Sequence, residues 1–217
     1  MFAACQNGHE GVVRMLLAKA ATDVNQATTD AHGTTPLFIA CDSGHTEVVR
    51  LLLAHAATDA NRATTNTGAT PLLIACEKGH EGVVRLLLAH AATDVDQARR
   101  NDGLTPLFVA CQKGHKNVVL LLLKKGADGS KETAYGTVLS FAEQQGHKGM
   151  VALLSSPIPI GSRVELRALQ AKPELNGRRG VVKNFIVEEG RCVVQLVGGD
   201  EGEKGFKLMP QNLAVLN

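Results

Sequence analysis

The sequence predicts a multi-domain α + β fold, in which an α-helical solenoid of repeated units is followed by a small all-β barrel. The first observation is a Gly-His dipeptide that begins at residues 8, 44, 79, 114 and 146, so that neighbouring copies are 32 to 36 residues apart. The second is that the apolar pattern changes to a period of two after residue 155, which is typical of strands. The third is that aromatic residues make up only 3% of the chain and Trp is absent. A core of Ala, Val and Leu suits closely stacked helices and disfavours an aromatic-lined cleft.

Each unit is predicted to contain two short helices joined by a turn and followed by a polar finger. Thr35 is placed to cap the first helix with its hydroxyl, and Pro36 fits the first turn, where its missing N–H costs nothing. Gly44 ends that helix in a left-handed conformation, and His45 opens a second helix with an apolar face of Val and Leu. One such unit cannot bury its apolar faces alone, so we expect neighbouring units to stack.

The unit resembles the ankyrin repeat, in which about 33 residues carry a Thr-Pro-Leu-His-x-Ala start and a Gly-His-x-x-Val-Val-x-Leu-Leu-Leu second helix. The resemblance covers residues 1–155 and comprises about five units. The first unit lacks the Thr-Pro start, because Met1–Cys5 aligns with Leu37–Cys41, and we expect a truncated gene model or a piece of a longer array. The last unit, Thr137–Leu154, is polar enough to act as a C-terminal cap.

The fingers depart from the family pattern. The Asp that ties one ankyrin repeat to the next is retained as Asp30, but Thr65 and Arg100 replace it in the following units.

A short proline-containing linker, 156–160, is predicted to lead into a β module at 161–217. Gly-rich turns separate four runs of alternating apolar residues in this module, and Pro210–Leu213 reads as one helical turn before a fifth strand. Five short strands arranged in this way predict a small closed barrel.

This module resembles the Src-homology-3-like barrels, and its Gly161-x-Arg163-Val164 and Gly177-x-x-Gly180-x-Val182 motifs are similar to the KOW type found in ribosome and transcription proteins. The motifs specify turns and buried valines rather than a ligand. Grooves for proline-rich peptides need paired Tyr and a Trp, and methyl-lysine cages need several aromatic side chains, so the composition disfavours both ligand classes.

Cysteines and histidines recur once per unit, which is not the pattern of a catalytic residue. Stacked helices lie about 10 Å apart, too far for a disulfide, so the aligned cysteines are expected to be buried reduced thiols in a reducing compartment, the cytoplasm or the nucleus. The recurring histidines lack neighbours at zinc-ligand spacing and are expected to hydrogen-bond between units. We therefore expect no enzymatic activity, no cofactor and no metal. The aligned cysteines are Cys5, Cys41, Cys76 and Cys111, and the histidines are His9, His45, His80, His115 and His147.

The resemblance implies a non-enzymatic adaptor or scaffold that binds a protein on the concave face of fingers and inner helices. Exposed positions that differ between near-identical units are expected to determine which partner binds. Arg99 and Arg100 suit a partner segment that is acidic or phosphorylated. These positions are Asp42, Ser43, Asn66, Thr67, Glu77, Lys78, Arg99, Arg100, Asn101, Asp102, Gln112 and Lys113.

Two alternatives stay open. The β module could make the chain a nucleic-acid or ribosome-associated factor through Arg178, Arg179 and Lys183, although a net charge of +2 disfavours a general binder of nucleic acid. The chain could also be the targeting fragment of a larger enzyme. No run approaches the roughly 18 apolar residues of a membrane span, so we expect no membrane partner, and we expect a monomer.

Overall fold

The computed structural model describes residues 1–19, 22–156, 158, 161–186, 189, 191–197 and 205–216. Contacts divide the chain into two compact units, Met1–Thr137 and Val138–Asn217. In the predicted linker, Pro157, Pro159 and Ile160 lie outside the described residues. The predicted domain boundary at residue 155 stays a prediction.

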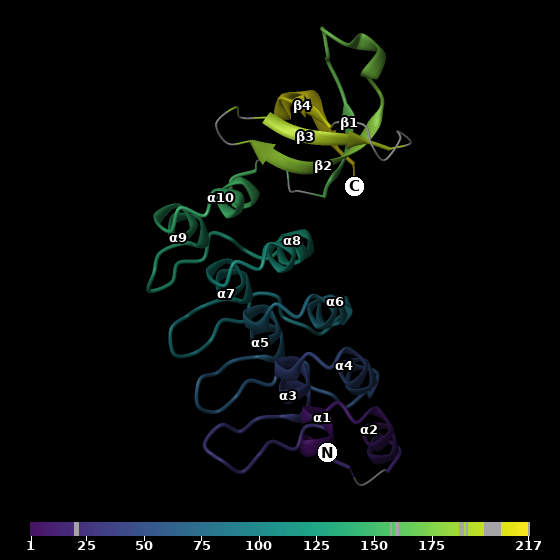
Figure 1. Cartoon of the computed structure of the whole chain (residues 1–217), viewed down its shortest axis with the longest axis vertical. Coiled ribbons are helices and arrows are strands. Elements are labelled where there is room, and N and C mark those ends of the chain that lie inside the picture. The colour runs from purple at the N-terminus through teal and green to yellow at the C-terminus, as the bar shows by residue number, and fades with distance from the viewer. Residues whose placement is uncertain are drawn as a thin grey trace. The chain divides into compact units, whose positions relative to one another are not determined.

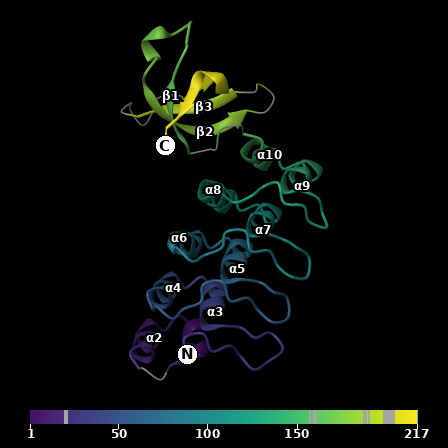
Figure 2. The same ribbon diagram turned by 180° about the vertical axis from the view of Figure 1, so that it is seen from behind.

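The first compact unit consists of two rows of helices. The inner row contains α1, α3, α5 and α7, the outer row contains α2, α4, α6 and α8, and both rows are visible in Figure 1 and from behind in Figure 2. The fingers, which are the loops that join each outer helix to the next inner helix, extend beside the inner row. The helices are α1 (Phe2–Gln6), α2 (Glu10–Leu17), α3 (Pro36–Ser43), α4 (Thr46–Leu53), α5 (Pro71–Lys78), α6 (Glu81–Ala89), α7 (Pro106–Gln112) and α8 (Lys116–Lys125).

The predicted helix starts and stops are confirmed. The Thr35 hydroxyl accepts a hydrogen bond from the Phe38 N–H at 3.1 Å, and Pro36 occupies the first turn of α3. The equivalent threonines, Thr70 and Thr105, cap α5 and α7 in the same way. Gly44 ends α3 in the left-handed region at φ 76°. These residue types recur because each inner helix must begin and end within about two turns.

Val, Leu, Ala and Cys build the core between the rows, as the composition predicts. The first valine of the outer helix is 1% exposed at Val48, 0% at Val83 and 2% at Val118. Its counterpart Val12 is 42% exposed, and among the described helices the one outer helix in contact with α2 is α4. Burial of these side chains therefore depends on the neighbouring unit, as expected for a solenoid.

The four aligned cysteines are fully buried free thiols. Burial raises the pKa of Cys5 and of Cys111 to about 11, and it raises the pKa of Cys41 and of Cys76 above the usual 9.0. The thiolate is the reactive form, so burial suppresses both access and ionisation.

The second compact unit joins two helices to a five-stranded antiparallel sheet in the order β4-β3-β2-β1-β5. α10 lies against β2, and the core face of the sheet is formed by Val164, Leu166, Val182, Cys192 and Val194. The elements are α9 (Val138–Gln144), α10 (Lys148–Leu154), β1 (Arg163–Leu166), the 3-10 turn η1 (Pro173–Leu175), β2 (Arg179–Ile186), β3 (Arg191–Leu196), β4 (Phe206–Leu208), the 3-10 turn η3 (Pro210–Asn212) and β5 (Leu213–Val215).

The described strands form an open sheet and not the closed barrel that the sequence predicts. β4 pairs only with β3, and β5 pairs only with β1, so these two strands are the edges. Each is three residues long, which leaves few backbone groups to close a barrel. The helical turn predicted at Pro210–Leu213 is confirmed as η3, directly before β5. The identity as a Src-homology-3-like or KOW-like barrel is not confirmed.

We predict that the four aligned thiols react slowly in the native chain. A pKa of about 11 leaves about 100-fold less thiolate than the usual value of 9.0, before access is considered. Timed alkylation at neutral pH followed by mass spectrometry should show at least this retardation for Cys41 and Cys76 relative to urea-unfolded chain. Rapid native labelling of all four, or an intramolecular crosslink on non-reducing electrophoresis, would contradict the stacked core.

Candidate functional site

A hydrogen bond from histidine to a helix end links each repeat to the one before it. In every case the imidazole Nε2 lies beside a backbone carbonyl in the last turn of the preceding inner helix, where carbonyls lack partners within the helix. A carbonyl only accepts, so Nε2 carries the proton and donates. The pairs are His45 with Gln6 at 2.9 Å, His80 with Asp42 at 3.0 Å, and His115 with Glu77 at 3.1 Å.

The glycine of the Gly-His dipeptide makes room for the next histidine. A Cβ on Gly44 would lie 2.8 Å from the His80 ring, and Gly8 and Gly79 face His45 and His115 in the same way. All three glycines also have positive φ, which favours glycine on backbone grounds. The predicted hydrogen-bonding role between units is therefore confirmed for these three histidines. The dipeptide recurs because one unit supplies the space and the next supplies the donor.

A second link between units was missed in the sequence. The Asn25 side chain donates from Nδ2 to the Ala57 carbonyl at 2.6 Å and accepts from the Asp59 N–H at 2.8 Å, so it pairs with the backbone of the next unit. Asn61 makes the same two bonds one unit later, at 2.5 and 2.9 Å, and Asp96 accepts from the backbone in the third copy. The available signal was the recurrence of Asn, Asn and Asp two residues after the Asp of each Ala-Ala-Thr-Asp.

The expected tie through Asp30 has a different form. Its carboxylate accepts from the Thr28 hydroxyl at 2.7 Å and from two backbone N–H groups of its own finger, and these bonds lower its pKa. At this position one link between fingers comes from Thr65, whose hydroxyl donates to the Ala31 carbonyl at 3.1 Å. At the position where ankyrin repeats usually carry this Asp, Thr65 therefore bonds to the preceding finger.

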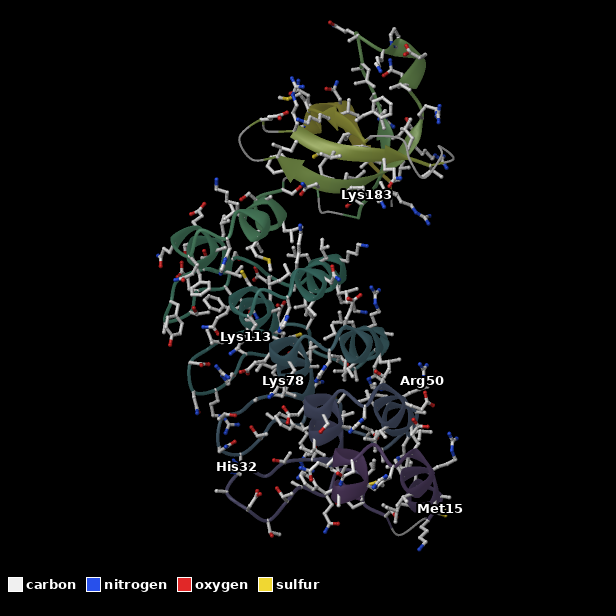
Figure 3. The ribbon with its side chains drawn as sticks, in the orientation of Figure 1. Met15, His32, Arg50, Lys78, Lys113 and Lys183 are labelled. Carbon is white, nitrogen blue, oxygen red and sulfur yellow. The ribbon has the colours of Figure 1, made fainter. Side chains whose placement is uncertain are left out.

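The variable positions of the inner helices pair with one another. Lys78 lies 3.4 Å from Asp42, and Lys113 lies 3.7 Å from Glu77, so each lysine contacts the acid of the preceding inner helix. Figure 3 labels both lysines beside the inner row. Their side chains are 49% and 47% exposed, so these ion pairs contribute little to stability. Ser43 is half-buried at the end of α3, and Gln112 is exposed.

Arg99 is already occupied within its finger. Its guanidinium donates through Nε and Nη2 to the Asp102 carboxylate, with the shortest contact at 2.6 Å, and Nη1 lies 3.6 Å from Glu77. The hydrogen bond between the two side chains raises the pKa of Arg99 and lowers the pKa of Asp102. Its side chain is only 21% exposed. Arg99 therefore differs from the free anchor expected from the sequence.

Arg100 is exposed, and its side chain has no hydrogen bond or ion pair within the described chain. Asn101 is exposed and donates to the Asn66 carbonyl at 3.3 Å. Asn66 in turn lies 2.6 Å from the His32 ring, and Thr67 bonds to Thr64 at 2.9 Å. Among the predicted finger residues, Arg100 offers the free charge.

The predicted basic residues of the β module are all exposed. Arg178 precedes β2, Arg179 begins it, and Lys183 is the extra residue where the register between β2 and β3 shifts. None of their side chains bonds to another described residue. The described residues contain no cluster of three or more His, Cys, Asp or Glu able to hold a metal ion, and no helix among them is long and apolar enough to cross a membrane.

We predict that Gly44→Ala destabilises the fold more than Gly114→Ala does. Both positions have similar positive φ, 76° and 78°, but no atom lies within 4 Å of a Cβ built at residue 114. The matched variant therefore measures backbone strain alone, roughly 1 kcal/mol. In urea unfolding, Gly44→Ala should lose more unfolding free energy than Gly114→Ala, and the difference is the cost of the contact with the His80 ring.

The double variant Gly44→Ala/His80→Ala tests the same contact. His80→Ala alone should cost about 1–2 kcal/mol, because the Asp42 carbonyl loses its donor. In the His80→Ala background, Gly44→Ala should cost no more than Gly114→Ala costs in the wild type. Strictly additive effects would contradict the role given to the glycine.

Comparison with known families supports this description. A family model described as Ankyrin repeats (3 copies) matches residues 1–64, 56–133 and 93–167, which together span residues 1–167. A comparison with curated proteins found no match. Ankyrin repeats are generally non-catalytic modules for protein interaction. The matched segments, the two rows of helices and the Gly-His links show that the chain belongs to the ankyrin-repeat family.

Proposed function

We propose that the chain is a non-enzymatic adaptor that binds a protein partner on the face formed by the fingers and the inner helices. The family membership carries this proposal, because ankyrin repeats are interaction modules. The buried free thiols suit a reducing compartment, so we place the adaptor in the cytoplasm or the nucleus, acting as a monomer.

The different contacts of the recurring and the variable residues support the choice of the finger and inner-helix face. Among the residues that recur, His80 and Asn61 bond to backbone atoms of the neighbouring unit, and Gly44 leaves room for the His80 ring. The side chains of the variable Lys78 on α5 and Lys113 at the end of α7 contact acidic side chains of the preceding inner helix and form no hydrogen bond with a backbone atom of the described residues. Substitution of the variable residues leaves the links between units intact, so the face can change its specificity without loss of the fold.

The charges favour a partner segment with carboxylate or phosphate groups. Lys78 and Lys113 hold acids only through exposed pairs at 3.4 and 3.7 Å, which a partner group can replace at little cost. Arg100 adds an exposed guanidinium that is free within the described chain. Arginine binds such groups in two-point contacts and is enriched at binding hot spots.

We predict that Arg100→Ala/Lys113→Ala weakens partner binding by about 1–3 kcal/mol and leaves folding stability nearly unchanged. The partner would be recovered with the intact chain as bait, and calorimetry would compare variants. Arg50→Ala is the matched control, because Arg50 is an exposed, ion-paired arginine on α4, in the outer row (Figure 3). Equal loss in the control, or unchanged affinity in the double variant, would place the binding face elsewhere.

We predict that Arg99 acts mainly on stability. Arg99→Ala and Asp102→Asn should each cost about 1 kcal/mol, and the double variant should cost less than their sum, because both remove one two-point pair. The folded pKa of Asp102 is depressed, so the stabilisation is present above the usual value of 3.8 and is lost as pH falls through the lowered pKa. Denaturant unfolding near neutral pH and at acid pH would measure the difference in unfolding free energy between the wild type and Arg99→Ala. A difference that is the same at both pH values would contradict the pair.

A further inference from the structure

The open sheet of the second compact unit carries a hollow on its solvent face, with a volume of ≈520 Å³. This volume lies within the range of about 300–1,000 Å³ that is usual for ligand sites. Its lining mixes two guanidinium groups with aliphatic side chains. The lining residues are Arg163, Arg179, Gly180, Val181, Val197 and Leu216.

Strand register explains how the two arginines come together. Arg163 on β1 lies directly opposite Val181 on β2. Arg179 lies two residues before Val181 on the same strand, so its side chain projects from the same face, while Gly180 and Val182 between and beyond them are buried. The two arginines are therefore diagonal neighbours, about 7–8 Å apart at the backbone, on either side of one valine.

Two backbone hydrogen bonds bring apolar side chains beside these arginines. The Val197 N–H donates to the Arg179 carbonyl at 2.9 Å, and the Leu216 N–H donates to the Arg163 carbonyl at 2.9 Å. Val197 is 61% exposed, although it is a large aliphatic residue. The hollow thus presents Val181 beside both arginines, with Val197 and Leu216 flanking the pair on the β3 and β5 sides.

Neither arginine is neutralised within the described chain. Glu165 lies opposite Arg179 in the β1–β2 register, but its carboxylate accepts from Arg167 Nε at 3.1 Å. No acid among the described residues lies within salt-bridge distance of Arg163 or Arg179. Of the basic residues predicted from the sequence in this module, Arg179 lines the hollow, whereas Arg178 and Lys183 do not.

We propose that this hollow binds an acidic peptide segment of a protein partner. Two of the segment's carboxylates pair with Arg163 and Arg179, since guanidinium groups hold carboxylates through two parallel bonds. An aliphatic side chain of the segment covers the exposed Val197 or Val181. Among the described lining residues there is no aromatic side chain, so they offer no stacking platform of the kind on which single-stranded nucleic acids depend. The site lies on a different compact unit from the array face, and it does not rest on the function proposed for that face.

The test uses the full chain and a fluorescein-labelled peptide in which glutamate alternates with leucine over about ten residues. Fluorescence anisotropy should show binding that weakens with salt. Arg163→Ala/Arg179→Ala should weaken it at least about tenfold, whereas Arg178→Ala, the same change at the neighbouring residue outside the hollow, should change it less than about twofold. Thermal unfolding would check that each variant folds.

A second variant separates shape from charge. Arg163→Lys/Arg179→Lys keeps both charges and removes the planar fork, so it should lose much of the affinity that the alanine variant loses. A peptide with lysine in place of glutamate should not bind. Unchanged affinity in the alanine variant, equal loss in Arg178→Ala, or tighter binding of an oligouridylate of similar length than of the acidic peptide would overturn the proposal.

Discussion

The hydrogen bond from each histidine to the preceding inner helix is the interaction on which the array depends. A helix of about two turns leaves half of its carbonyls without partners, and a stacked neighbour removes water from them. His80 supplies the missing donor to the Asp42 carbonyl, and Gly44 allows the ring to approach. Stacking and polar satisfaction are therefore achieved by the same contact, which is why the two residues recur together.

Much of the array could be predicted from the sequence because its determinants are local or periodic. The cap at Thr35, the left-handed Gly44 and the spacing of valines each act within one unit. The bonds of Asn25 were missed, because an asparagine in a polar loop has no local signature and its partners lie 32 and 34 residues further on. The closed barrel was wrong because strand count and alternation describe single strands, whereas closure depends on whether the edges β4 and β5 pair.

Arg99 shows why variation between units is an imperfect guide to binding residues. In the preceding finger, Thr64 and Thr67 join their hydroxyls at 2.9 Å, and the equivalent positions in the next finger are Arg99 and Asp102, joined by a guanidinium–carboxylate pair. One link within the finger has been exchanged for another, so the two positions vary together for a structural reason. A variable position is a binding candidate only when its new side chain has no partner inside the chain, which among the described finger residues favours Arg100.

The same criterion applies to the β module and changes which residues matter there. Sequence neighbours such as Arg178 and Arg179 look equivalent, but the pleat and the register place Arg179 beside Arg163, which lies 16 positions earlier in the chain (179 − 163). The neighbouring Glu165 is ion-paired with Arg167, and the described residues show no ion pair between it and Arg163 or Arg179. A near-neutral chain can thus present local positive sites, because the distribution of intramolecular pairs, rather than the net charge of +2, decides which cations remain available to a partner.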